Sequence, residues 1–173
     1  MEARAGRVFQ VNVSGGGVPK RAVAAARVTP LGLEADAVAH PKIHGGPERA
    51  VCLYALERVL ALQEEGHPVF PGALGENLTL VGVDWSSLAA GDTLALGGDD
   101  GPVLQLVKPT QPCRTIAPFF ADGGFRRVEH ERRPGWSRWY ARVLREGDVR
   151  PGDAVRVRAP EAAPEEAAGV RPA

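Results

Sequence analysis

The chain has 173 residues, which is enough for one domain with a substantial hydrophobic core. Lys and Arg together number 21, as do Asp and Glu, so the formal net charge is zero. This balance excludes a bulk electrostatic attraction to nucleic acid or to an anionic membrane, and we expect neither as a partner. No stretch approaches the roughly 18 apolar residues of a membrane-spanning helix, and residues 1–4 lack the apolar core of a secretory signal. We therefore expect a cytoplasmic protein with reduced thiols.

The first half of the chain is predicted to hold short strands and one helix. Residues 7–13 alternate in hydropathy and predict a strand, and residues 22–28 predict a weaker one because they are rich in alanine. Residues 50–54 are continuously apolar, which fits either a buried strand or the start of a helix. We interpret them as a strand that leads into a helix over residues 56–65, with Gly66 as its natural end.

The next strands are short and separated by turns. Residues 78–81 and 94–96 each predict a strand. An Asp-Asp-Gly turn at residues 99–101 then leads into a strand over residues 103–107.

The last elements before the C-terminus are a helix and a strand. Residues 136–146 are interpreted as an amphipathic helix, because Trp139, Val143 and Leu144 would share one helical face. Residues 154–158 predict the final strand.

These elements predict a mainly β fold with short helices. Many short strands with two or so amphipathic helices indicate a closed or nearly closed β-barrel with the helices packed outside it. We assign residues 1–158 to this domain. Residues 159–173 contain Val170 as their one large apolar side chain, so we expect them to form a disordered C-terminal tail.

Cys113 is the strongest candidate for chemistry. It lies in a proline-containing polar loop, residues 108–115, directly after a predicted strand. Within this loop Lys108 and Arg114 lie on either side of Cys113 in the sequence, a setting that favours an exposed and reactive thiolate. Cysteine is also often a small buried hydrophobic residue, and the neighbouring residues leave both interpretations open.

The second cysteine, Cys52, lies in a continuous apolar run and is predicted to be part of the core. The two cysteines lack the spacing of a zinc site or of a disulfide framework. A disulfide between Cys52 and Cys113 remains open at this level.

Residues 42–49 form a second polar segment that could bind an anion. Adjacent glycines let backbone amides approach an anion closely, and basic side chains nearby could add charge. The same residues are also typical of an ordinary surface loop. The candidates in this segment are Lys42, His44, Gly45, Gly46 and Arg49.

Asn77 is the candidate in a third segment, residues 72–79. Its side chain could hydrogen-bond a polar ligand at the start of a strand, or it could simply stabilise a turn.

Together these segments resemble the MOSC domain family, the molybdenum cofactor sulfurase C-terminal domain. The resemblance lies in residues 44–51 (HGGPERAV), residues 72–79 (GALGENLT) and the pair Pro112-Cys113, in this order along the chain. It covers about residues 5–158, and the ordered combination is far more specific than any single motif.

The resemblance implies a β-barrel that binds a molybdenum cofactor of the molybdopterin type. The conserved cysteine of the family maps onto Cys113, as a molybdenum ligand or a persulfide carrier, and its Arg and Asn map onto Arg49 and Asn77. Family members often carry an arginine where this chain has Thr110, and Arg114 or Lys108 would then help to neutralise the cofactor's phosphate. The cofactor-binding residues that we expect from the two loops are Lys42, His44, Gly45, Gly46, Arg49, Asn77, Thr110, Arg114 and Thr115.

Relatives are similar to the mitochondrial amidoxime-reducing component, so the resemblance implies an oxidoreductase that reduces N-hydroxylated compounds. Such an enzyme would need a separate electron-donor protein. The alternatives are a sulfur carrier, with a persulfide on Cys113 received from a sulfur-donor protein, and a non-enzymatic cofactor-binding module. No pyridoxal phosphate is expected, because the chain is too short to include a desulfurase domain.

Overall fold

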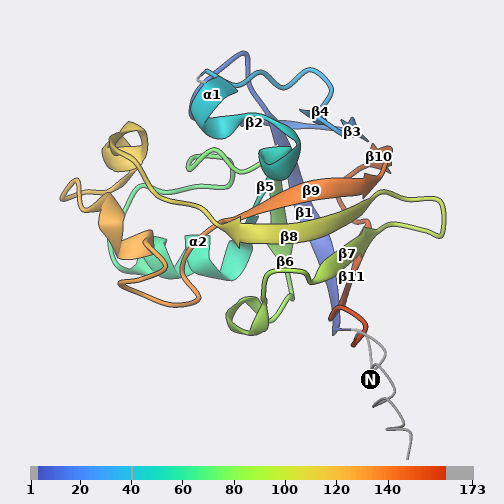
Figure 1. Cartoon of the computed structure of the whole chain (residues 1–173). Coiled ribbons are helices and arrows are strands. Elements are labelled where there is room, and N and C mark those ends of the chain that lie inside the picture. Colours follow the sequence, from blue (N-terminus) through green and yellow to red (C-terminus); the bar gives the residue numbers. More distant parts are fainter. Residues whose placement is uncertain (1–3, 40, 163–173) are drawn as a thin grey trace, which may run out of the picture.

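The computed structural model describes residues 4–39 and 41–162, and a closed β-barrel of seven strands forms its centre (Figure 1). Pairing of the first strand with the last closes the ring, which leaves its members without a free edge. The predicted β-barrel is therefore confirmed. Of the predicted C-terminal tail, residues 163–173 lie outside the described residues, so its disorder stays a prediction.

The order of strands around the ring differs from their order in the chain. All neighbours in it are antiparallel except β5 and β6, which are parallel. The ring runs through β1 (Arg4–Val13), β11 (Ala154–Arg158), β7 (Thr93–Leu96), β8 (Val103–Pro109), β9 (Trp139–Arg145), β5 (Val51–Ala55) and β6 (Leu78–Val81).

A small second sheet lies beside the barrel. It contains β10 (Gly147–Val149), β3 (Ala26–Thr29) and β4 (Gly32–Leu33), while β2 (Arg21–Val23) pairs with β1. The single strand predicted over residues 22–28 is thus two strands in different sheets. The chain bends between them, which lets β2 pair with β1 and β3 pair with β10.

The parallel pair β5–β6 is joined by helix α2 (Leu56–Glu64). Parallel neighbours need a crossover connection, and a strand that is covered on both faces reads as a continuous apolar run. All residues of β5 are buried, and α2 packs on β5 and β6 with Val59 and Leu62 buried beneath it. This arrangement explains the apolar run and confirms the predicted strand followed by a helix that ends near Gly66.

The predicted helix over residues 136–146 is wrong, because this segment forms strand β9. Trp139 and Ala141 are buried and alternate with half-buried neighbours, which is the period of a strand. Leu144, which a helix would have placed on the apolar face, is 53% exposed. The segment hydrogen-bonds to β8 on one side and to β5 on the other, and this pairing overrides the helical spacing.

Among the described residues, α2 is the one α-helix longer than a single turn, rather than the two or so amphipathic helices expected. The other helices are short and lie in loops. They are α1 (Pro41–His44) and the 3₁₀ segments Pro47–Arg49, Trp85–Ser87, Arg114–Phe119 and Phe125–Val128.

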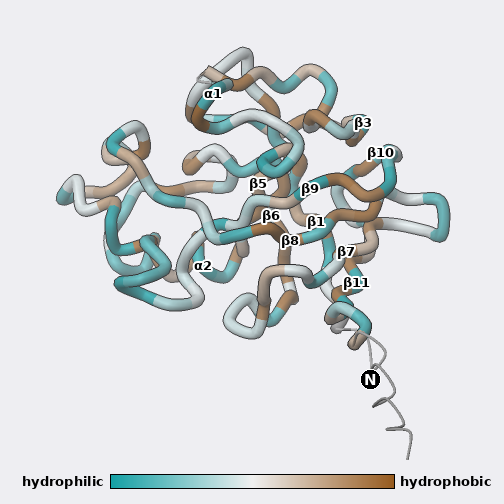
Figure 2. The backbone as a smooth tube through the Cα atoms, in the orientation of Figure 1, coloured by the Kyte–Doolittle hydropathy of each residue, from teal (hydrophilic) through white to brown (hydrophobic). Residues whose placement is uncertain are grey.

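The core fills the inside of the ring. Leu53, Leu80, Leu94 and Leu104 come from four different strands of the barrel and are fully buried. Hydrophobic stretches follow the central strands, whereas the outer loops are largely hydrophilic or neutral (Figure 2). Within residues 4–39 and 41–162, none of the helices has the length and apolar character needed to cross a membrane.

The loop before β6 is held by buried polar contacts. The amide of Gly72 donates to Oε1 of Glu76 at 2.6 Å, and its carbonyl accepts from the amide of Lys20 at 2.9 Å. Gly72 has a φ of 90°, and a Cβ there would overlap the carbonyl oxygen of Lys20. A glycine is therefore required by both the conformation and the close approach of the backbone.

We predict that Gly72→Ala is much more damaging than Gly66→Ala. Both glycines have φ near 90°, but no atom lies within 4 Å of a Cβ on Gly66. The left-handed conformation alone should cost about 1–2 kcal/mol at either site. The overlap at Gly72 should remove about a further 1–3 kcal/mol from the free energy of unfolding. Urea denaturation measures both, and equal losses would contradict the packing that we describe.

Glu76 predicts a specific pH dependence of stability. Its carboxyl group is fully buried, and burial raises its pKa above the ordinary value of 4.5 despite hydrogen bonds that act in the opposite direction. When an acidic group has a higher pKa in the folded state than in the unfolded state, the folded protein loses stability as that group ionises. Relative to Glu76→Gln, the wild-type protein should therefore lose unfolding free energy as the pH rises from below 4.5 through the raised pKa. Urea titrations of both proteins at several pH values should show this trend, and the opposite trend would refute it.

Candidate functional site

A solvent-open pocket lies at the end of the barrel where β8 ends and where β5, β6 and β9 begin. It contains about 920 Å³ of space free of protein atoms, a volume that includes open solvent at its mouth. Its polar and sulfur-bearing lining residues are Lys20, Asp36, His44, Arg49, Cys52, Asn77, Gln111, Cys113, Thr115, Arg138 and Tyr140.

The structure brings together candidates from all three predicted segments. His44, Arg49, Asn77, Cys113 and Thr115 line this one pocket, although they are far apart in the sequence. Their position is thus established, while their role in binding a cofactor stays a prediction.

Other candidates do not line the pocket. Lys42 and Arg114 are exposed, and Thr110 is buried next to the β8–β9 pairing, where its amide donates to the carbonyl of Arg138.

The glycine pair does not form the anion cradle that the sequence suggested. The amide of Gly45 donates to the carbonyl of Pro41 at 2.9 Å and closes the turn of α1, so it is not available to an anion. Neither Gly45 nor Gly46 is among the pocket-lining residues. Any anion in the pocket would therefore rely on side chains rather than on these amides.

Both cysteines are free thiols, and both face the pocket. Cys113 is half-buried and directly precedes the 3₁₀ segment Arg114–Phe119. Cys52 is 7% exposed within β5, and burial raises the pKa of its thiol to about 11. Cys52 is therefore protonated at neutral pH. Cys113 is the more exposed of the two thiols.

Asn77 joins the start of β6 to two other segments. Its Oδ1 accepts from the backbone amide of Cys52 at 3.0 Å, and its backbone amide donates to the carbonyl of Cys52 at 2.7 Å. Its Nδ2 donates to Asp36 at 2.8 Å and to the carbonyl of Asn12 at 3.4 Å. Asp36 in turn forms an ion pair with Lys20 at 2.7 Å. Asn77 therefore positions the pocket wall, and its hydrogen-bonding groups are already used.

Tyr140 connects β9 to the α1 region. It lies opposite Cys52 in the β5–β9 pairing, and its hydroxyl group is 3.0 Å from Nδ1 of His44. The guanidinium group of Arg49 lies over its ring, 5.8 Å from the centroid. Burial raises the pKa of Tyr140 to about 12, so the phenol is neutral at ordinary pH.

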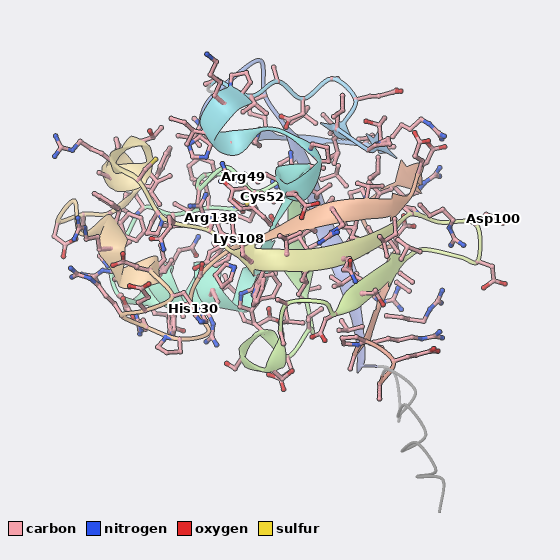
Figure 3. The ribbon with its side chains drawn as sticks, in the orientation of Figure 1. Arg49, Cys52, Asp100, Lys108, His130 and Arg138 are labelled. Atoms are coloured by element: carbon pink, nitrogen blue, oxygen red, sulfur yellow. The ribbon has the colours of Figure 1, made fainter. Side chains whose placement is uncertain are left out.

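Arg138 is a pocket residue that sequence reasoning missed. It immediately precedes β9 and is 9% exposed, and its Nη1 donates to the carbonyl of Leu74. Figure 3 shows Arg138, Arg49 and Cys52 in the same region beside the start of β9, while Asp100 lies at the far end of the β7–β8 hairpin. The sequence analysis did not identify Arg138 because it predicted a helix over residues 136–146. A helix there gives no indication that the side chain of Arg138 would face this pocket.

The pocket combines an accessible thiol with two guanidinium groups. A thiolate suits a thiophilic centre, and guanidinium groups suit phosphate or carboxylate. The arrangement of Cys113, Arg49 and Arg138 therefore suits a ligand that carries both.

Comparison with known sequences gives a family and several relatives. The model of the MOSC domain matches residues 40–156. The uncharacterized protein YflK of Bacillus subtilis is 38% identical over 120 residues, which are 69% of this chain and 52% of YflK. YiiM of Escherichia coli is 37% identical over 90 residues, which are 50% of this chain and 39% of YiiM. The chain thus spans about half or less of the length of these curated relatives.

A more distant relative from Gibberella moniliformis carries the name reductase. It is 31% identical over 116 residues, which are 65% of this chain but 20% of that protein.

Solved structures share the fold of this chain. YuaD from Bacillus subtilis superposes with a TM-score of 0.73 at 17% identity, over 92% of this chain and 99% of YuaD, a likeness that shows the fold alone. YiiM from Geobacillus stearothermophilus superposes with a TM-score of 0.67 at 26% identity, over 88% of this chain and 74% of the YiiM chain. The family match over most of the chain and the shared barrel lead to one conclusion: this chain belongs to the MOSC domain family.

Proposed function

We propose that this protein binds a molybdenum cofactor of the molybdopterin type and reduces N-hydroxylated compounds. The observation that carries the proposal is the position of Cys113, an accessible free thiol in a pocket that also contains Arg49 and Arg138. Membership of the MOSC family supports it, as does the relative named reductase.

The residues present fit such a cofactor. Cys113 would ligate the molybdenum, since soft metal centres accept thiolates well. Arg49 and Arg138, which line the same pocket, would neutralise the phosphate. Arg138 forms no ion pair with any described residue, so its positive charge could be balanced by an anionic group in the pocket.

The cofactor, when bound, would supply the two-electron redox chemistry. The chain would orient it and shield it through the rigid walls formed by β5, β6 and β9. Reducing an N–OH group to N–H takes two electrons and two protons and releases one water. We propose that the electrons come from a separate donor protein.

A second candidate function is sulfur transfer. Cys113 lies on a loop and is half-buried rather than enclosed, so a partner protein could reach a persulfide carried on it. The outer sulfur of the persulfide would then be transferred to a metal–sulfur site elsewhere, with two electrons from a donor protein to bring it to the sulfide level, and Cys113 would return to the thiol. The experiments below separate this function from the first.

We predict that Cys113 reacts with thiol reagents much faster than Cys52. Cys113 is more exposed, and Cys52 is buried and its thiol has a pKa of about 11. Substoichiometric iodoacetamide on the native protein, followed by peptide mass spectrometry, measures the ratio. Cys113→Ser should remove the fast reaction and Cys52→Ala should keep it. Faster modification of Cys52 would contradict the proposed reactive role of Cys113.

We further predict that Cys113→Ser lowers the reduction of an amidoxime, with a chemical electron donor, by at least about 100-fold. A direct metal ligand should matter at least as much as the outer contacts of a metal site, whose loss costs roughly 10–100-fold. Cys52→Ala is the matched control, because it removes the other pocket thiol and should leave the rate within a few-fold.

Elemental analysis decides between the candidates. Protein from a host that makes the cofactor should contain molybdenum. Molybdenum without activity would indicate a binding module instead. Protein without molybdenum but with a persulfide on Cys113 would indicate the sulfur carrier.

A further inference from the structure

A groove lies on the outer face of the barrel, on strands that do not form the pocket mouth. It crosses β11, β7 and the start of β8, beside the β7–β8 hairpin whose turn residue Asp100 is labelled in Figure 3. The groove contains about 600 Å³ of space free of protein atoms, a volume that includes open solvent. Its lining shares no residue with that of the pocket, and three of its members are Arg145, Arg156 and Arg158.

Strand pairing explains why long basic side chains stand beside a floor of small ones. Successive residues of a strand point to opposite faces, and β7 buries its two leucines in the barrel, so Thr93 and Ala95 face outward. On β11, Arg156 lies opposite Ala95 and Arg158 lies opposite Thr93. The two arginines therefore form one side of the groove, and the short side chains of β7 form its floor.

Arg145 forms the opposite side. Ala95 pairs with Val103 on β8, and Val103 pairs with Arg145 on β9, so one row of residues runs from Arg156 across four strands to Arg145. Neighbouring strands are about 4.8 Å apart, which places the backbones at the two ends of this row about 14 Å apart. Nε of Arg145 donates to the carbonyl of Gly101 at 2.8 Å, which holds this side chain beside the hairpin turn.

The positive charge of the groove exceeds the negative charge around it. Within residues 4–39 and 41–162, Arg145, Arg156 and Arg158 form no ion pair. The side chains of Arg156 and Arg158 also form no hydrogen bond with a described residue. Asp99 supplies the one carboxylate among the lining residues. Like charges at neighbouring positions of a sheet repel one another, so an anion in the groove would relieve this repulsion.

We propose that this groove binds a ligand that carries two or more phosphate groups, either a nucleoside triphosphate or an inorganic polyphosphate. Guanidinium groups bind phosphate oxygens through paired N–H donors, and the hydroxyl group of Thr93 adds a further donor on the floor. A chain of phosphates can contact arginines on both sides of the floor at once. The inference goes beyond the proposed function and does not rest on it, because the groove and the pocket have no residue in common.

The test is an NMR titration of the isotope-labelled protein with inorganic triphosphate, at constant ionic strength and without divalent cations. Triphosphate should shift the backbone amide signals of Thr93, Ala95 and Val103, and sulfate, the reference anion, should bind more weakly. The double variant Arg156→Gln/Arg158→Gln should raise the dissociation constant of triphosphate about 10-fold, because it removes two charge-assisted contacts that solvent partly screens.

Arg132→Gln is the matched control, because Arg132 is exposed, is paired with Glu129 and does not line the groove. It also removes one positive charge, yet it should bind triphosphate as the wild type does. The single variants Arg156→Gln and Arg158→Gln compare with it charge for charge, and each should weaken binding about 3-fold. They also decide the question if the double variant does not fold.

Three results would overturn the proposal. The first is a wild type that does not prefer triphosphate over sulfate, and the second is equal affinity of the wild type and the arginine variants of the groove. The third is a set of shifted signals around Cys113 instead of around the groove, since the anion would then be in the pocket.

A parallel titration with ATP distinguishes the two sources of the phosphate groups. Tighter binding of ATP than of inorganic triphosphate assigns the groove to a nucleotide whose nucleoside adds contacts. Equal or weaker binding of ATP assigns it to inorganic polyphosphate. Both results support a phosphate-binding groove, and neither depends on molybdenum or on the proposed reaction.

Discussion

The reciprocal hydrogen bonds between Cys52 and Asn77 are the contact on which the arrangement of the pocket depends. They join Cys52, the second residue of β5, to Asn77, which directly precedes β6. Oδ1 of Asn77 accepts from the backbone amide of Cys52, and the backbone amide of Asn77 donates to the carbonyl of Cys52. The same side chain reaches Asp36, which ties the loop before α1 to the barrel. One buried amide therefore fixes three segments at one end of the ring. A network of buried polar groups specifies a unique arrangement only when each group has its hydrogen-bond partner. Here both Oδ1 and Nδ2 of Asn77 have one.

The environment makes the two thiols unequal although they share a pocket. Cys52 is in the middle of the packed wall, where burial favours its neutral form. Cys113 follows the end of β8, at a place where the chain leaves the sheet and its side chain meets solvent. Loops that a rigid scaffold holds in position often carry function for this reason. The barrel thus keeps one thiol buried and protonated and leaves the other partly exposed at the pocket.

Much of the barrel and part of the site could be predicted from the sequence. The strand–helix–strand unit from β5 to β6 followed from an uninterrupted apolar run with a helical pattern after it, and the motifs around Arg49, Asn77 and Cys113 pointed to one site. β9 could not be predicted, because Trp139 and Val143 fit a helical face as well as one face of a strand, and pairing with β5 and β8 decides between them. Because β9 was not predicted, the pocket residues Tyr140 and Arg138 were not predicted either. The anion role assigned to Gly45 failed because its amide closes a helical turn, which composition does not reveal.

The proposed function requires that the sulfur of Cys113 binds molybdenum. X-ray absorption at the molybdenum edge tests it most directly, on protein from a cofactor-competent host, with Cys113→Ser and Cys52→Ala prepared in the same way. We expect that in Cys113→Ser the metal loses one sulfur neighbour and gains a lighter one, while Cys52→Ala matches the wild type. The same sulfur coordination in the wild type and Cys113→Ser would contradict the ligand role of Cys113.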